Sequence, residues 1–223
     1  MKIDLHSHIL PKADHGSAGI EDSLKQLNAA KKNGIETIVA TPHFYAFNDS
    51  INMFLARRDK AYADLCKINV TGVKIVLGAE VRLTANLYAL HGLKKLAISG
   101  TDCILLEMPR RTWDNTILDA VLKIQSVCEL NVIIAHIERY PKKEAMKLFD
   151  LGVIAQINAY SLYNLASRHT IIEYIKKGYI QFIGSDSHIY NTSIAYRCLG
   201  MSLKNMGRYT DQMMDNAKKI LSL

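Results

Sequence analysis

The sequence has no long apolar run and no closely spaced cysteines. Among its 223 residues, no apolar stretch reaches the roughly 18 residues that a membrane-spanning helix needs. The N-terminus has no signal-peptide layout, because Asp4, His6 and His8 interrupt it. The 4 cysteines form no CxxC pair, so we expect reduced thiols and no disulfide framework. These absences predict a cytoplasmic protein that is not inserted in a membrane.

Motifs of several common function classes are missing as well. The net charge of +7 is spread over paired lysines and arginines, and no RNP, helix-turn-helix or zinc-finger pattern accompanies it, so we expect no nucleic-acid partner. No Cys-x5-Arg loop supports a thiol-based phosphatase, and no Gly-x4-Gly-Lys-Ser/Thr loop supports a nucleotide site. The positive charge suits an anionic substrate or an acidic partner surface.

The chain alternates short β-branched runs with longer segments of helical period, which is typical of βα units around a parallel sheet. Strands are expected at 3–5, 37–40, 73–77, 103–106, 131–135, 153–157 and 179–183. Helices are expected at 21–32, 51–68, 113–128, 142–151, 167–177, 193–205 and 210–221. No linker or repeat interrupts this order, so we predict one domain over residues 1–223. Seven strands favour a closed or nearly closed barrel, with a twisted open α/β sheet as the alternative.

Imidazoles and carboxylates gather at the ends of the predicted strands. In parallel barrels these ends meet on one rim, so residues distant in sequence come together there. Nitrogen and oxygen donors without a thiolate favour Mn, Fe or Zn. About nine donors are too many for one four-coordinate ion, which predicts two or three divalent metals bridged by a carboxylate such as Glu80. The candidate ligands are His6, His8, Asp14 or His15, His43, Glu80, Glu107, His136, Asp186 and His188.

The spacing of two motifs supports this prediction. Alternate residues of a strand point to the same side, so His6 and His8 can reach one group of cations while Ser7 faces away. Asp186 and His188 repeat that spacing after the last strand. A multinuclear site lowers the pKa of a bound water and presents hydroxide in line with an electrophile. Phosphate-ester hydrolysis is therefore the predicted reaction.

The motifs, in their order, resemble those of a known family. DLHSHILPKADHG, ATPHF, GAE, LLEMP, AHIERY and SDSH are similar to motifs of the PHP (polymerase and histidinol phosphatase) superfamily, and most of all to its bacterial capsule-type tyrosine phosphatases, the CpsB/CapC group. The resemblance covers nearly the whole chain. It implies a distorted (β/α)7 TIM-like barrel, the PHP fold, with a trinuclear site that usually holds Mn(II). It also implies a protein-tyrosine phosphatase acting on a cognate bacterial tyrosine kinase that controls capsular or exopolysaccharide synthesis.

The resemblance also assigns roles to residues. The metal ligands would be those named above, Arg139 would bind phosphate, and we expect Arg139, Asp186 and His136 to carry catalysis. Two departures stand out. The group usually has Asp-Asp-Gly where this chain has Asp14-His15-Gly16, and we favour His15 over Asp14 as the ligand. The group's Arg-Pro-Pro segment is absent from 189–193, and its phosphate-binding arginine would be either missing or replaced by Arg110, Arg111 or Arg197.

Three alternatives stay open at this point. A histidinol phosphatase of the same superfamily would hydrolyse a small phosphoester. An amidohydrolase also begins with HxH, but that class ordinarily has a bridging lysine where this chain has Glu107. A catalytically silent metal-binding or kinase-docking module would have lost several ligands, and the motifs retain essentially all of them. Phe44, Tyr45 and Trp113 lie in segments where they could stack on a tyrosyl ring, although local packing is the more frequent role of such residues.

Overall fold

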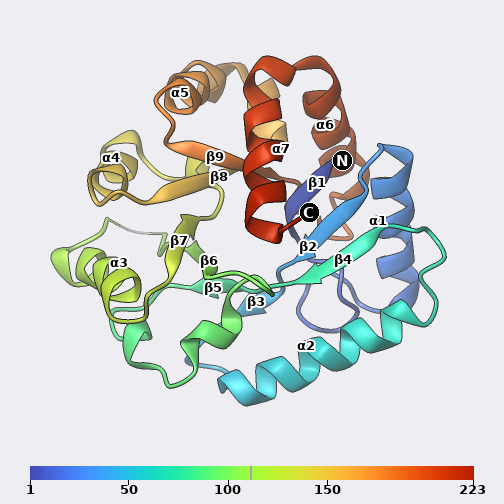
Figure 1. Ribbon diagram of the computed structural model, residues 1–223, viewed down its shortest axis with the longest axis horizontal. Helices are drawn as coiled ribbons and strands as arrows, with labels where there is room; N and C mark the ends of the chain where they lie inside the picture. The colour runs from blue at the N-terminus through green and yellow to red at the C-terminus, as the bar shows by residue number, and fades with distance from the viewer. Residues whose placement is uncertain (111) are drawn as a thin grey trace.

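The computed structural model describes residues 1–110 and 112–223, with strands in the middle of the molecule and helices around them (Figure 1). All paired strands run parallel. The predicted α/β class with parallel strands is confirmed. The strands are β1 (Ile3–Ser7), β2 (Thr37–Ala40), β3 (His43–Phe44), β4 (Lys74–Leu77), β5 (Glu80–Arg82), β6 (Cys103–Glu107), β7 (Asn131–Ile134), β8 (Ile154–Asn158) and β9 (Ile180–Gly184).

Seven α-helices among the described residues occupy the predicted helical segments. Three of them begin at side-chain caps: the Ser50 hydroxyl accepts from the Met53 N–H at 3.3 Å, the Asp114 carboxylate accepts from the Ile117 N–H at 3.1 Å, and the Asn164 side-chain oxygen accepts from the Ala166 N–H at 3.0 Å. Because Asp114 caps the third helix, that helix starts two residues later than predicted. The helices are α1 (Ile20–Lys32), α2 (Ile51–Cys66), α3 (Asn115–Ser126), α4 (Lys142–Asp150), α5 (Leu165–Lys176), α6 (Thr192–Asn205) and α7 (Gly207–Leu221).

Two of the predicted strands continue, after a short break, in a second strand that was not predicted. The strands form one sheet in the order β1-β2-β4 and another in the order β3-β5-β6-β7-β8-β9. Ala40 pairs with Leu77 in the first sheet and His43 pairs with Glu80 in the second, so the same register continues across the break. Pro42 lies within the break, and it has no N–H to donate to the ladder. β3 and β5 thus extend β2 and β4, and their C-terminal position was not predicted.

The first and last strands lie next to each other. Asp186 N donates to the His6 carbonyl at 2.8 Å, and His8 N donates to the Ser187 carbonyl at 3.0 Å. The buried Asp4 carboxylate accepts from the backbone N and the hydroxyl of Ser185, at 2.7 and 2.6 Å. Burial raises the pKa of Asp4 to about 6 against the effect of these hydrogen bonds. β1 is therefore held against the segment that follows β9.

Helix α7 covers the end of the molecule opposite to the strand C-termini. It crosses in front of β1 and β9 in Figure 1. Ile3 N, at the start of β1, donates to the Met214 sulfur at 3.3 Å, and the Asn216 amide donates to the Gln181 carbonyl near the start of β9 at 3.2 Å. The C-terminal ends of the strands stay free of this helix, so they are available for a site.

The interior is built from strands that are buried on both faces. All five residues of β6 are buried, including Leu105 and Leu106 at 0% exposure, as is typical of parallel sheets covered by helices. Burying one such leucine contributes about 1.5–3 kcal/mol.

All four cysteines are free thiols, as predicted. No helix within the described residues combines the length and the apolar character that crossing a bilayer requires.

Candidate metal centre

The end of β1 places two imidazoles side by side. His6 and His8 are 0% exposed, and their Nε2 atoms lie 3.1 Å apart. The Ser7 hydroxyl between them points the other way and hydrogen-bonds the Tyr196 hydroxyl of α6 at 3.0 Å. The extended strand therefore gives the arrangement that its alternating geometry predicts.

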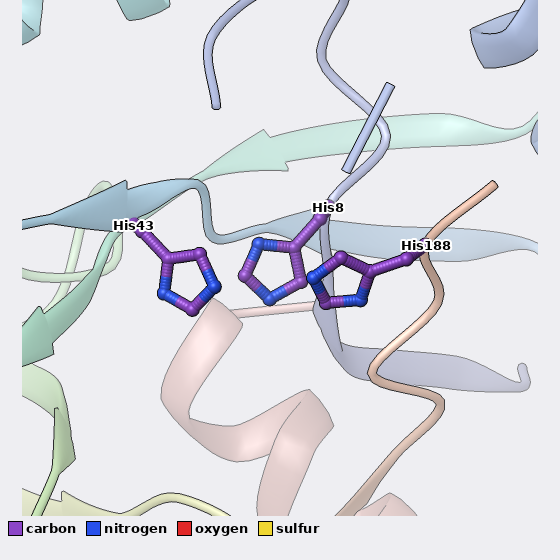
Figure 2. Close-up of side chains that lie close together, drawn as sticks. All are labelled: His8, His43 and His188. Atoms are coloured by element: carbon purple, nitrogen blue, oxygen red, sulfur yellow. The ribbon is translucent and has the colours of Figure 1, made fainter. Parts of the chain in front are cut away.

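Four further segments bring side chains to the same point. Figure 2 shows His43 of β3 and His188 of the segment after β9 on either side of His8. The ring centroids of His8 and His188 lie 4.1 Å apart, and those of His8 and His43 lie 4.4 Å apart. Glu80 of β5 and His136 after β7 join them, with His136 Nε2 2.7 Å from Glu80 Oε1. Strand ends far apart in sequence thus converge at one site.

The carboxylate of Glu80 occupies the centre of the cluster. Its Oε2 atom lies 3.2 Å from His6 Nε2, 3.2 Å from His8 Nε2 and 3.0 Å from His43 Nδ1. Glu80 Oε2 and His43 Nδ1 are buried and have no hydrogen-bond partner among the described residues. A buried carboxylate oxygen without a hydrogen bond is costly. A cation among these atoms would satisfy both, so the donor set fits a metal.

Three overlapping groups of donors could each hold an ion. In each group the ligand atoms lie within 4.8 Å of one another. Together the groups contain Glu80 and six other side chains of the predicted ligand set. Their imidazole and carboxylate donors suit Mn, Fe or Zn. The groups are His6, His8 and Asp186; His43, Glu80 and Glu107; and His8, His43 and His188.

Asp14 holds the imidazole of His8 from outside the cluster. Its Oδ2 accepts from His8 Nδ1 at 2.7 Å and from His43 N at 2.8 Å, and its Oδ1 accepts from Gly16 N at 2.8 Å. This leaves His8 Nε2 directed at the centre. A Cβ added to Gly16 would lie 2.1 Å from the Cβ of His8, so the loop reaches His8 this closely only with glycine there.

His15 faces the cluster with its ring. The ring centroid lies 4.8 Å from that of His43 and 4.9 Å from that of His188. Its side chain lines a hollow of about 470 Å³ that the cluster opens into. The two residues therefore differ. The Asp14 carboxylate already accepts three hydrogen bonds, whereas the His15 imidazole lies near two candidate ligands.

Two amides of β8 belong to the site and were not predicted. Gln156 Oε1 accepts from His6 Nδ1 at 3.1 Å and from His136 N at 2.9 Å. Asn158 Nδ2 donates to Asp186 Oδ2 at 2.9 Å. Both are 0% exposed, and they lie two residues apart at the end of a strand. That spacing, the same as in His6 and His8, is the signal that could have identified them.

The charges of the cluster perturb its protonation. Burial alone would lower the pKa of His8, but the Asp14, Asp186 and Glu80 carboxylates raise it well above its usual value. Burial would raise the pKa of Glu80, yet the imidazoles around it, beginning with His6, hold it well below its usual value. The Glu80 carboxylate is therefore ionised at neutral pH.

His136 and Asp186 hold unusual backbone conformations. Their φ angles are +35° and +51°, in a region that residues other than glycine seldom adopt. The carbonyl of Asp186 accepts from the Asn191 amide at 3.1 Å, and His136 N is bound by Gln156. Local hydrogen bonds thus hold the strained turns that direct both side chains into the cluster.

Three arginines lie at the edge of the cluster. Arg82 of β5 lines the hollow of about 470 Å³ and pairs through Nη1 with Glu107 Oε2 at 2.8 Å. Arg139, at the end of a short 3-10 helix (Ile137–Arg139), donates through Nη2 to Asp186 Oδ2. Arg110 and Arg139 both line the hollow of about 470 Å³, and both also line an adjoining one of about 570 Å³. Arg111 lies outside the described residues. Arg197 lines a third hollow, between α1 and α6, apart from the candidate ligands.

The three loop aromatics have different environments. Phe44 and Trp113 are 1% and 4% exposed, so they pack in the interior. Tyr45 lines the hollow beside the cluster, with its ring 5.3 Å from that of His43. Of the three, only Tyr45 can meet a molecule bound there.

Comparison with known proteins identifies a family and named relatives. A family model described as capsular polysaccharide synthesis, CpsB/CapC, matches residues 2–222. The chain is 27% identical over 205 residues to the tyrosine-protein phosphatase YwqE of Bacillus subtilis, which covers 85% of this chain and 78% of that protein. It is 25% identical over 240 aligned positions to the tyrosine-protein phosphatase CpsB of Streptococcus pneumoniae, which covers 98% of each.

The fold is also shared with solved structures. The crystal structures of YwqE from Bacillus subtilis and CpsB from Streptococcus pneumoniae, described as unique metal-dependent tyrosine phosphatases, include a chain that superposes with a TM-score of 0.80. The match covers 99% of this chain and 94% of that chain at 23% identity. Because the family model spans nearly every residue, the chain belongs to the CpsB/CapC family of capsular polysaccharide synthesis proteins.

Proposed function

We propose that this chain is a metal-dependent protein-tyrosine phosphatase. Its curated relatives carry that name. The observation that carries the proposal is one hollow, lined by Arg110 and Arg139 together with Asp186 and His188 of the cluster. Guanidinium groups bind phosphate oxygens in pairs. A phosphate group held by the arginines would therefore lie against the metal centre.

The cluster would hold two or three divalent ions, with Mn(II) favoured and Fe or Zn as alternatives. Glu80 would bridge, since its two oxygens face different imidazoles. Bound ions would lower the pKa of a water and neutralise charge on the phosphoryl oxygens. The ligands would be His6, His8, His15, His43, Glu80, Glu107, His136, Asp186 and His188, with Asp14 as the residue that orients His8.

Arg139 would orient the phosphate. Asp186 Oδ2 accepts from the Arg139 guanidinium and from Asn158 Nδ2, so the guanidinium has a fixed position. Its remaining N–H groups would donate to two phosphate oxygens. The leaving phenolate has a pKa of about 10, so it departs with little help from an acid. His136, fixed by Glu80 and Gln156, would complete the catalytic group.

The substrate would be phosphotyrosine on a cognate bacterial tyrosine kinase that controls capsular or exopolysaccharide synthesis. The family's description in terms of capsular polysaccharide synthesis supports this. We further propose that the seven strand positions form the distorted (β/α)7 barrel of the PHP fold, which the bonds between β1 and the segment after β9 support. A cytoplasmic location stays a prediction.

The function can be tested with three substrates. The protein loaded with Mn(II) is incubated with a tyrosine-phosphorylated kinase tail, with the same peptide carrying phosphoserine, and with histidinol phosphate. We expect release of phosphate from the phosphotyrosine peptide, at a rate at least about tenfold above the other two. Hydrolysis of histidinol phosphate alone would show that the proposed substrate is wrong.

A pair of histidine variants tests the site itself. His136→Ala removes a side chain that is 1% exposed in the cluster, and we expect it to lower metal content and p-nitrophenyl phosphate turnover. His169→Ala is the matched control, because His169 lies exposed on α5. A folded His136→Ala protein with full metal content and full turnover would contradict the site assignment.

A further inference from the structure

The third hollow lies between α1 and the first turns of α6, and it shares Tyr190 with the hollow beside the metal centre. Its volume is about 690 Å³, which is ample for the end of a charged side chain. Figure 1 shows the two helices next to each other. A Cβ added to Gly200 of α6 would lie 2.8 Å from the carbonyl of Asn33, so glycine lets the helices approach closely. The end of α1 and the start of α6 thus share one hollow.

The hollow is lined by cations and by no carboxylate within the described part of the chain. Lys25 and Lys32 of α1 and Arg197 of α6 all line it. Lys25 forms an exposed ion pair with Asp22 at 3.3 Å. Neither Lys32 nor Arg197 has an ion-pair partner among the described residues. The first turn of α6, which lines the same hollow, adds the positive end of a helix dipole. The local charge favours an anion.

Tyr190 connects this hollow with the phosphate site. It lines both the hollow of about 470 Å³ beside the metal centre and the basic hollow. Its side chain is 77% exposed, and its ring lies 5.2 Å from that of His188. Because Tyr190 borders both hollows, an extended peptide with its phosphotyrosine in the centre would place a flanking side chain past Tyr190, among the cations.

We propose that Lys25, Lys32 and Arg197 form a subsite for an anionic side chain that flanks the phosphotyrosine of a peptide substrate. The anion would be a carboxylate or a second phosphate, since both offer oxygens to lysine and arginine. This rests on the proposed phosphatase function and adds substrate selection to it. Arg197 then serves the substrate next to the reacting phosphate, a role different from the one predicted from sequence.

The test compares three phosphotyrosine peptides that differ at one flanking position, which carries Gln, Glu or phosphoserine. We measure initial kcat/KM for tyrosine dephosphorylation by the Mn(II)-loaded protein. We expect the Glu and phosphoserine peptides to exceed the Gln peptide by about three- to tenfold, the scale of one or two exposed ion pairs. The preference should shrink at high salt, because exposed charges are screened.

Charge-neutralised variants locate the effect. In the double variant Lys32→Gln/Arg197→Gln we expect the preference for both anionic peptides to fall to within about twofold of unity. Lys31→Gln is the matched control, since Lys31 is exposed on the same helix but does not line the hollow. Lys31→Gln should retain the full preference for the anionic peptides. In the wild-type protein, the ratio of kcat/KM for the phosphoserine peptide to that for the Glu peptide shows which anion the subsite favours.

The outcomes separate this proposal from the function on which it rests. If the wild-type protein hydrolyses the Gln peptide as fast as the other two, or if the double variant keeps the preference, the subsite is wrong and the phosphatase function stands. An equal loss of preference in Lys31→Gln would also overturn the subsite, because total charge would then be the cause. Hydrolysis of none of the peptides would overturn both.

Discussion

The buried and open halves of the site differ in how their charges are held. In the buried half, His6, His8 and Glu80 are 0–1% exposed, and other protein atoms surround each charge. In the open half, the Arg139 side chain is 35% exposed and Tyr190 is 77% exposed. Removing the partner of a buried charge strongly destabilises the folded protein, whereas water can replace a partner that is lost at the surface. Substitution should therefore cost much more in the buried half.

Differences from the related phosphatases follow the same division. The cluster side chains match the motifs that the family resemblance predicts, while both departures fall at or near the open half. His15 lines the hollow, and the segment at 189–193 lies between the two hollows that Tyr190 lines. An exposed anion-binding side chain can be replaced, or its role taken by a neighbour, because solvation keeps the loss of stability small. The open half is thus where selectivity can change while the metal centre is kept.

The largest effect is expected from Glu80→Gln. The amide keeps the shape of the side chain but removes the charge that faces four imidazoles. We expect loss of bound metal and a fall in p-nitrophenyl phosphate turnover of at least about a hundredfold. Metal analysis and steady-state rates measure this. The control is Glu129→Gln, an exposed glutamate paired with Lys94 at 2.9 Å; full metal content in Glu80→Gln would contradict the assignment.

An intermediate effect is expected at the boundary, where Asp14 and His15 are compared. Asp14→Asn should weaken metal binding by about 10–100-fold, as is typical for a residue that orients a ligand, while high metal concentration restores full occupancy. His15→Gln should lower the number of bound ions even at saturating metal. Titration followed by metal analysis distinguishes affinity from stoichiometry. The reverse pattern would identify Asp14 as the ligand.

The smallest effect is expected from Arg110→Gln. Arg110 is exposed and lines both hollows beside the cluster, so it would contribute one screened contact to phosphate. We expect KM for a phosphotyrosine peptide to rise by about two- to fivefold with little change in kcat. Arg208→Gln, an exposed arginine on α7, is the control. A hundredfold loss of kcat in Arg110→Gln would contradict this prediction, because losses of that size are expected only from residues in the buried half of the site.

The parts of the fold that follow from periodicity could be predicted. Each expected strand segment contains a strand, because a buried parallel strand needs a continuous apolar run such as that of β6. β3 and β5 were missed because strands of two or three residues give no periodic signal. Pro42 also suggests the end of a strand, not a short break within one. That residues 1–223 form one domain stays a prediction.

The candidate site could be predicted only where topology alone brings residues together. Parallel strands dictate that His6, Glu80 and His136 meet at one edge. The sequence could not predict which arginines lie beside the cluster and which lie in the third hollow. The positions of Arg110 and Arg197 depend on the paths of the loop after β6 and of the segment before α6, and packing determines those paths. Gln156 and Asn158 were missed because a neutral amide in a strand gives no metal-ligand signal, although their alternate spacing matches that of His6 and His8. The ligand roles themselves stay predictions.

The pairing of β1 with the segment after β9 has a consequence for synthesis. Backbone bonds join the first strand to the segment after the last one: Asp186 N donates to the His6 carbonyl, and His8 N donates to the Ser187 carbonyl. During translation, the first histidines would leave the ribosome long before the aspartate that completes their group. Contacts of such long sequence separation form late and slow folding. A partly synthesised chain can therefore expose imidazoles to cellular metals but cannot assemble the phosphatase centre.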